Sequence, residues 1–259
     1  MNCVRWEQSY RINCESDCYH CAALAPMQDC SSNANSVQMS LKSKIALRFS
    51  IAIVVFGALL FIPAGSLRFW QGWVYIATWC VPGLLAFAYF YKYDPQLIER
   101  RLRFKEKVRG QKRIMTGVYP TWLIVMLLPG LDHRFGWSHQ PLWITILAQA
   151  VVCGSYITTF WVINVNRFAA RTIQVETGQT VVSTGPYGVV RHPMYSAVCA
   201  MSLFTPLALG SYYTLPAFFL LIPLIALRLL NEEDVLRQQL PGYPEYCLHT
   251  RFRLVPFLW

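Results

Sequence analysis

Apolar residues in this chain fall into long runs that contain no Asp, Glu, Lys or Arg. The runs cover residues 49–67, 69–91, 114–131, 135–166 and 193–227. A helix needs about 20 apolar residues to cross the roughly 30 Å hydrocarbon core of a bilayer. A succession of runs this long predicts several membrane-spanning helices rather than the core of a water-soluble domain. Prolines within the runs are compatible with such helices, because neighbouring helices satisfy the freed carbonyls.

The last run, residues 193–227, is too long for a single span at about 1.5 Å of rise per residue. Residues 209–213, Leu-Gly-Ser-Tyr-Tyr, lie in its middle and offer a turn. We therefore expect a helical hairpin in an all-α fold, a polytopic integral membrane helical bundle with five to six membrane-embedded helices. The chain would comprise a polar N-terminal extension (1–40), N-terminal transmembrane helices (41–163) and a C-terminal functional region (164–259).

The charges add an expected orientation. Charged residues make up 14% of the chain, against about 25% in soluble domains, which argues against a soluble enzyme. The net charge is +10, and nine basic residues lie in the loop 92–113. The positive-inside rule places this loop in the cytoplasm. Alternation of the spans then places residues 167–192 and both termini in the cytoplasm as well. We expect a multi-pass protein of a bacterial inner membrane. Because no nucleic-acid motif accompanies the basic loop, we expect the lipid bilayer as partner, no nucleic acid and no obligate protein partner.

The N-terminal extension is polar and rich in cysteine. It holds Cys3, Cys14, Cys18, Cys21 and Cys30. The spacing Cys14-x3-Cys18-x2-Cys21 matches that of radical S-adenosylmethionine enzymes, but this sequence cannot encode the strand-and-helix barrel that such a cluster needs. A zinc site is the other metal alternative. We favour a coincidental spacing and no metal site, in a disordered and dispensable extension over 1–38 that precedes a natural start at Met39. The remaining cysteines are expected to be buried small hydrophobes; they are Cys80, Cys153, Cys199 and Cys247.

Polar residues gather against the membrane helices in two places on the expected cytoplasmic side. The first is 164–195, where Gly185-Pro186 signals a turn and Pro193 suits the first turn of a helix. Arg191 and His192 would then lie beside unpaired backbone donors at the start of that helix, where a polar or anionic ligand binds. An interfacial anchor, with Arg and Tyr side chains at the level of the lipid headgroups, explains the same residues equally well.

The second gathering, residues 228–234, follows the last apolar run directly. We expect the helix to continue through its three consecutive acids, since acids at a helix C-terminus would oppose the helix dipole. Arg228 and Glu232 are four residues apart and therefore share a face. One interpretation is a plain intrahelical ion pair. The other is a site in which Glu232 holds the ammonium group of a ligand and Arg228 an anionic group of the other substrate, for which its planar fork is suited.

These two gatherings together resemble the isoprenylcysteine carboxyl methyltransferase family, whose relatives include the phospholipid N-methyltransferases. The resemblance rests on Gly185-Pro186-Tyr187-x3-Arg191-His192-Pro193-Met194-Tyr195, on Glu232-Glu233 after a hydrophobic hairpin, and on Gly242-Tyr243-x2-Tyr246. It covers residues 164–259. It implies S-adenosyl-L-methionine as cofactor in a cytoplasmic pocket and a lipophilic or small-molecule methyl acceptor that arrives laterally from the bilayer. In one departure, Ala197 stands where the family often has Gly.

The resemblance also implies roles for individual residues. Gln179, Thr180, Val181 and Val182 correspond to a strand-like cofactor segment, and Tyr187, His192, Pro193, Met194 and Tyr195 to the adenosine and methionine contacts. Glu232 corresponds to the acid that holds the cofactor's amine, and Arg228 to the arginine that meets the acceptor's carboxylate. Methyl transfer from a sulfonium depends mainly on positioning and exclusion of water. A carboxylate acceptor, which we favour, needs only Arg228 to orient it, whereas an amine, hydroxyl or thiol acceptor needs a base such as Glu233 or Tyr195.

Two other functions stay open at this point. Membrane sterol reductases share a similar C-terminal helical region, and their tails resemble Tyr246-x4-Arg251-Phe252-Arg253-Leu254-Val255-Pro256. This resemblance implies an NADPH-dependent oxidoreductase, although those enzymes have a longer N-terminal membrane region than this chain has. The third alternative is a membrane protein without catalytic activity.

Overall fold

The computed structural model describes residues 29–102, 109–168, 175 and 178–259. The chain divides into two compact units, residues 1–51 and 52–259, and the candidate site lies entirely within the second. The described residues are 76% helical and include no strand. The all-α fold expected from the sequence is therefore confirmed.

The helices follow the apolar runs closely. They are α1 (Asp29–Ala64), α2 (Trp70–Tyr93), α3 (Pro95–Leu102), α4 (Arg109–Phe135), α5 (Leu142–Val165), the 3₁₀ helix η1 (Gly185–Gly188), α6 (Pro193–Ala208), α7 (Leu215–Gln239) and α8 (Tyr243–His249). Helices α1, α2, α4, α5 and α7 are long and apolar enough to cross a membrane, and α6 is a shorter apolar helix. This pattern fits a multi-pass integral membrane protein.

The C-terminal hairpin is confirmed. Helices α6 and α7 flank a turn at residues 209–214, and Pro193 begins α6 as expected. Gly210 adopts a φ of +77° in this turn, a conformation that favours glycine. Helix α7 also continues through the acids to Gln239, which keeps Arg228 and Glu232 on one helical face.

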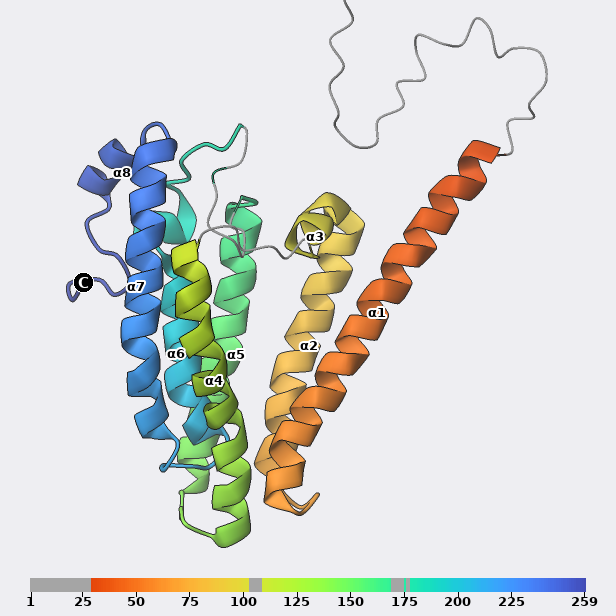
Figure 1. Cartoon of the computed structure of the whole chain (residues 1–259), viewed down its shortest axis with the longest axis vertical. Coiled ribbons are helices and arrows are strands. Elements are labelled where there is room, and N and C mark those ends of the chain that lie inside the picture. Colours follow the sequence, from red (N-terminus) through yellow and green to blue (C-terminus); the bar gives the residue numbers. More distant parts are fainter. Residues whose placement is uncertain (1–28, 103–108, 169–174, 176–177) are drawn as a thin grey trace, which may run out of the picture. The chain divides into compact units, whose positions relative to one another are not determined.

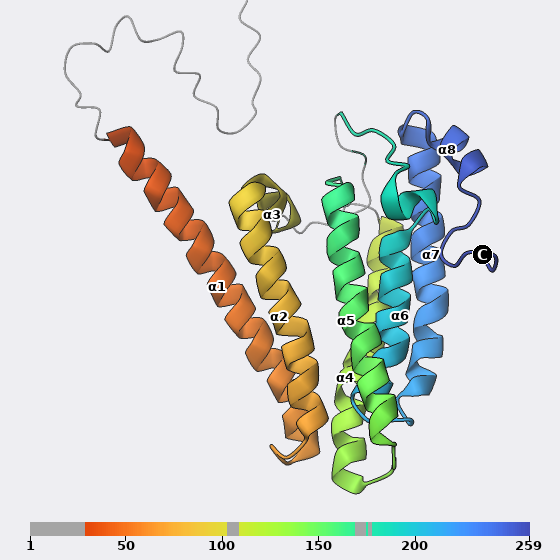
Figure 2. The same cartoon turned by 180° about the vertical axis from the view of Figure 1, so that it is seen from behind.

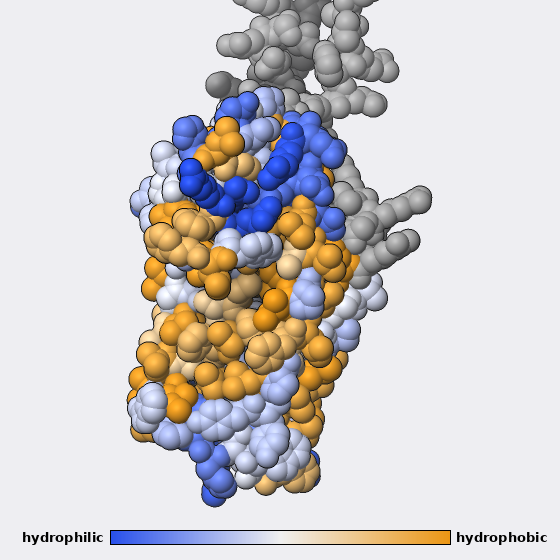
Figure 3. Space-filling model, turned by 90° about the vertical axis from the view of Figure 1, so that its left-hand side faces the viewer, coloured by the Kyte–Doolittle hydropathy of each residue, from blue (hydrophilic) through white to orange (hydrophobic). Residues whose placement is uncertain are grey.

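Helices α4, α5, α6 and α7 form a bundle, with α2 packed along α5 (Figures 1 and 2). Leu60, Phe69, Val152 and other fully buried side chains form its main core. Figure 3 shows a broad apolar belt on the α7 side, with polar residues gathered at one end. Residues 178–192 and α8 belong to the end of the bundle that carries the last turns of α7 (Figure 1).

A buried carboxylate fixes the turns at the other end of the bundle. Asp132, 2% exposed, accepts hydrogen bonds from the Ser138 backbone N–H and hydroxyl, both at 2.7 Å, and from the Ser211 hydroxyl. Asp132 thereby joins the α4–α5 turn to the α6–α7 turn. Since a buried carboxylate is tolerated only when its oxygens are hydrogen-bonded, this network holds the hairpin in place.

The N-terminal extension of the sequence-based division lies partly outside the described residues. Residues 1–28, with Cys3, Cys14, Cys18 and Cys21, are not described, and helix α1 begins within the remainder of the polar extension, at Asp29. The cysteines that follow, Cys80, Cys153, Cys199 and Cys247, are half-buried rather than fully buried. The orientation across the membrane stays a prediction.

Close packing of α1 against α4 depends on Gly130. A Cβ atom at this position would lie 2.6 Å from the carbonyl oxygen of Leu60, so the two helices would have to separate. We expect Gly130→Ala to lower the free energy of unfolding by about 1–3 kcal/mol, the usual cost of overpacking. Thermal unfolding in detergent micelles measures this change. Gly154→Ala on α5, where an added Cβ meets nothing within 4 Å, is the matched control, and an equal effect of both changes would contradict the expectation.

Candidate functional site

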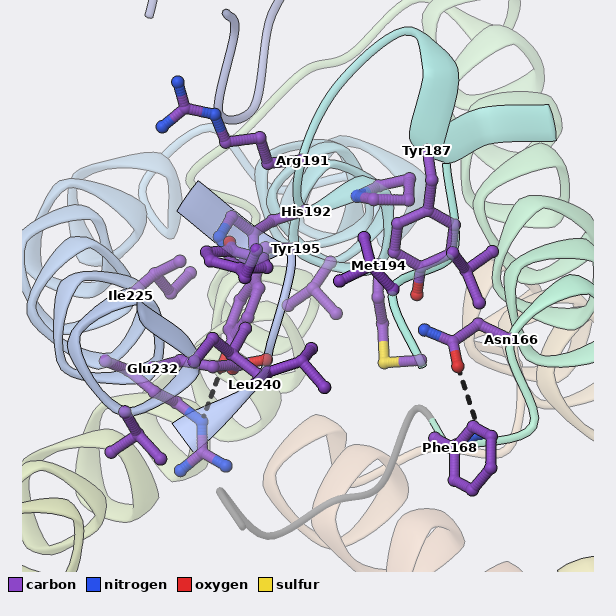
Figure 4. Close-up of a pocket in the computed structure, with 18 of the residues that line it drawn as sticks. Asn166, Phe168, Tyr187, Arg191, His192, Met194, Tyr195, Ile225, Glu232 and Leu240 are labelled. Carbon is purple, nitrogen blue, oxygen red and sulfur yellow. Dashed lines mark hydrogen bonds between the residues drawn. The ribbon is translucent and has the colours of Figure 1, made fainter. Parts of the chain in front are cut away.

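A cavity of about 670 Å³ opens among α4, α6, α7, α8 and the 178–192 segment. Cavities of this size hold a nucleotide-sized ligand. The structure places eleven residues singled out in the sequence around it: Gln179, Thr180, Val181, Val182, Tyr187, His192, Pro193, Met194, Tyr195, Arg228 and Glu232. The two polar gatherings therefore meet at one cavity. Figure 4 shows Tyr187, Asn166 and Met194 on one side of it, facing Tyr195 and Glu232 on the other.

A polar triad crosses from α6 to α7 inside this mostly apolar cavity. The Tyr195 hydroxyl donates to Glu232 Oε2 at 2.7 Å and accepts from Arg228 Nε at 3.1 Å. Arg228 also donates through Nη1 to the Met115 sulfur at 3.3 Å. The tyrosine thus holds an acid and a guanidinium at fixed positions one helical turn apart. An ammonium group and an anionic group can be bound side by side at such a pair.

Hydrogen bonds from α8 and the residue after it fix the η1 turn. The Tyr187 carbonyl accepts hydrogen bonds from the Tyr246 hydroxyl at 2.7 Å and from the Thr250 hydroxyl at 3.3 Å. The Tyr187 hydroxyl hydrogen-bonds the Asn166 side chain, and burial raises the pKa of Tyr187 to about 12. Burial likewise raises the pKa of Tyr246 to about 12. Both phenols are therefore neutral over the physiological pH range and act as hydrogen-bonding groups.

Glu233, predicted as a possible base, lies outside the cavity lining. Its side chain is 3% exposed, and it forms ion pairs with Arg191 Nη1 at 3.1 Å and Arg253 Nε at 3.0 Å. His192 Nε2 lies 3.4 Å from Glu233 Oε1, and Arg237 Nη2 lies 3.6 Å from Oε2. With both oxygens engaged by cations, Glu233 anchors α7 to Arg191 and Arg253 and is not placed to take a proton from a ligand in the cavity.

Arg191 belongs to the same buried cluster. Besides the pair with Glu233, its Nε donates to the Thr250 carbonyl at 2.6 Å and its Nη2 to the Cys247 carbonyl at 3.0 Å. Figure 4 shows its guanidinium directed away from the cavity. Arg191 therefore fixes the backbone of the motif against α7 and α8 rather than offering its charge to an anionic ligand.

Several lining residues were given no site role from the sequence, although Asn166 belongs to the polar gathering 164–195. Helix α4 contributes Met115, Val118 and Tyr119, and residues 166–168 contribute Asn166 and Phe168. The α4 residues directly follow the basic loop in the sequence. Their expected position at the membrane boundary, level with the polar gatherings, could have identified them. Residues 179–183 form neither a helix nor a strand, so they do not show the strand-like form that the resemblance implies.

Comparisons with known proteins point to the same region. Residues 143–241 match the family model described as phospholipid methyltransferase. The Delta(14)-sterol reductase of Mus musculus is 30% identical over 91 residues, which are 34% of this chain and 22% of the reductase. The chain thus spans about a fifth of the length of that curated relative.

The phospholipid methyltransferase match includes nearly all of α5, residues 179–182 and the α6–α7 hairpin, and therefore most of the cavity wall. It supports a membrane methyltransferase more directly than the partial likeness to a reductase supports an oxidoreductase. The resemblance to the methyltransferases related to the isoprenylcysteine carboxyl methyltransferases is confirmed to this extent: residues 143–241 match the phospholipid methyltransferase family model.

Proposed function

We propose that the chain is an integral membrane methyltransferase that uses S-adenosyl-L-methionine and methylates an anionic group of a lipophilic acceptor. The observation that carries the proposal is the Tyr195–Glu232–Arg228 triad inside the cavity that the matched region surrounds. When bound, the cofactor supplies a sulfonium methyl group, which a nucleophile can accept without a metal.

The residues of the cavity fit such a cofactor. Glu232 is the acidic side chain of the described lining, and its carboxylate is suited to an ammonium group. Tyr195 holds that carboxylate in place through its hydroxyl. The segment 179–182, Tyr187 and Met194 supply backbone polar groups and apolar contact for a nucleoside. The half-buried position of Glu232 strengthens the electrostatic attraction, because the surroundings are less polar than water.

Arg228 would orient the acceptor. Arg228 lines the cavity one helical turn from Glu232, and its guanidinium attracts an anion. The α4 and α7 side chains Val118, Leu224 and Ile225 form an apolar wall nearby, suited to a hydrocarbon chain. A carboxylate is already deprotonated at neutral pH, so its methylation needs no base. This chemistry favours a carboxylate over an amine as the acceptor group.

Transfer of labelled methyl groups into membrane lipid and protein extracts tests the proposal. We expect membranes that contain the chain to incorporate label from S-adenosyl-L-methionine into a lipid-soluble product. Mild alkali should release this label as methanol, as it does from a methyl ester. Alkali-stable label would place the methyl group on a hydroxyl oxygen, nitrogen or sulfur instead, and no incorporation above membranes that lack the chain would contradict the proposed activity.

Replacement of Arg228 distinguishes a role in acceptor binding from a role in cofactor binding. Arg228→Lys keeps the charge but removes the planar fork, which is not a conservative change at a bidentate site. We expect kcat/KM for the acceptor to fall by about 10- to 100-fold, equivalent to losing one charge-assisted hydrogen bond. The Kd for S-adenosylhomocysteine should change less than threefold, by calorimetry. Equal losses in both quantities would assign Arg228 to the cofactor.

The partial likeness to the sterol reductase makes NADPH binding the alternative. Calorimetry with the purified chain distinguishes the two: we expect binding of S-adenosylhomocysteine and none of NADPH. NADPH binding alone would favour a reductase, and binding of neither would favour a membrane protein without this catalytic activity.

A further inference from the structure

Large apolar side chains are exposed on the segment that follows α8. We refer to residues 251–259 as the return segment. Phe257 is 92% exposed and Leu258 is 80% exposed, and Val255 beside them is half-exposed. A contiguous apolar group of this kind marks a surface that another apolar phase covers.

The return segment is a defined turn rather than a loose end. The backbone N–H groups of Arg253 and Leu254 donate to the Trp259 carbonyl at 2.8 and 3.1 Å. The Arg253 guanidinium lies over the Trp259 ring at 5.4 Å, and the rings of Phe252 and Phe257 are 5.2 Å apart. Phe257 has a φ of +65°, which is uncommon for a bulky residue. These contacts hold the exposed phenylalanine at the tip of the turn.

Hydrogen bonds place the return segment beside the first turn of a membrane helix. The Arg191 and His192 N–H groups donate to the carbonyls of Phe252 at 2.9 Å and Arg253 at 3.0 Å. The hydroxyl of Ser196, in the first turn of α6, donates to the Leu254 carbonyl at 2.6 Å. Figure 1 shows the chain returning from α8 along α7 toward its apolar part. The turn therefore lies beside the start of α6 and along the apolar α7.

We propose that the return segment inserts Phe257 and Leu258 into the lipid bilayer at the boundary between headgroups and acyl chains. The composition fits this depth, because aromatic residues are enriched there and the exposed Arg251 can reach lipid phosphates. The segment returns along α7, which is long and apolar enough to cross a membrane (Figure 1). Through Arg253, which pairs with Glu233, the inserted turn also braces the Arg191–His192 backbone at the cavity. The inference does not depend on the proposed methyl transfer.

Photocrosslinking tests the insertion. Benzoylphenylalanine replaces Phe257 in the full chain, reconstituted into vesicles of phosphatidylethanolamine and phosphatidylglycerol. The matched control carries the same probe at Glu245, an exposed polar position on α8. We expect lipid adducts, detected by mass spectrometry, to be about tenfold more abundant at 257 than at 245, since only the first probe would contact acyl chains.

A thermal unfolding midpoint equal to that of the unlabelled chain shows that the probe leaves the fold intact, and a probe at Leu258 provides a second reading. Equal adduct yields at 257 and 245, or crosslinks at 257 to a second copy of the chain in place of lipid, would overturn the proposal. An absence of lipid adducts at both 257 and 258 would overturn it as well.

Discussion

Glu233→Gln should lower the free energy of unfolding by about 3 kcal/mol, near the lower end for breaking one side of a buried ion pair. The glutamine keeps the shape and one acceptor oxygen but leaves the guanidinium of Arg191, whose side chain is 9% exposed, without its counter-charge. In a chain of this size the midpoint of thermal unfolding should fall on the order of 6–12 °C. The measurement is unfolding of the purified chain in detergent.

The adjacent acid provides the matched control for this prediction. Asp234→Asn removes the same charge one residue further along α7, at an exposed position, and should change stability by less than about 0.5 kcal/mol. An equal loss in both variants would mean that net charge, not the buried cluster, governs stability. Arg253→Gln should reproduce part of the Glu233 effect, because it removes a more exposed member of the same cluster.

Glu232→Gln should weaken binding of S-adenosylhomocysteine by about 10- to 150-fold, the loss of one hydrogen bond to a charged group. The glutamine can still accept from the Tyr195 hydroxyl, so α6 and α7 should stay in register and stability should change little. Calorimetric titration of the purified variant measures the affinity.

Glu245→Gln, an exposed change of the same type on α8, controls for the altered net charge. Unchanged affinity in Glu232→Gln would remove this residue from the cofactor site. Affinity lost together with thermal stability would instead indicate a damaged fold, and the unfolding midpoint distinguishes these results.

The hairpin and the convergence on one cavity were predictable because they depend on local patterns. The length of the apolar run 193–227 required a turn, and Gly210 with Ser211 marked its position. The spacing of Arg228 and Glu232 placed both side chains on one face once the helix was known to continue. The motif that ends at Tyr195 began a helix at Pro193, so its polar residues had to gather near the start of α6.

The partner of each acid was not predictable from the sequence. Successive residues on a helix point about 100° apart, so Glu232 and Glu233 face different surroundings although they are neighbours. Only the packing of α7 against α6 and α8 directs one to the cavity and the other to Arg191 and Arg253. These pairs join residues far apart in the sequence, and helical periodicity gives no information on such contacts. The same applies to the α4 side chains on the cavity wall.

Photoaffinity labelling with an azido derivative of S-adenosylmethionine tests the central claim most directly. The proposed site predicts saturable adducts in peptides that contain residues 179–195 or 228–246. Excess S-adenosylhomocysteine should abolish the labelling, and NADPH should not. Saturable labelling confined to other peptides, or no labelling that S-adenosylhomocysteine displaces, would contradict the assignment of this cavity.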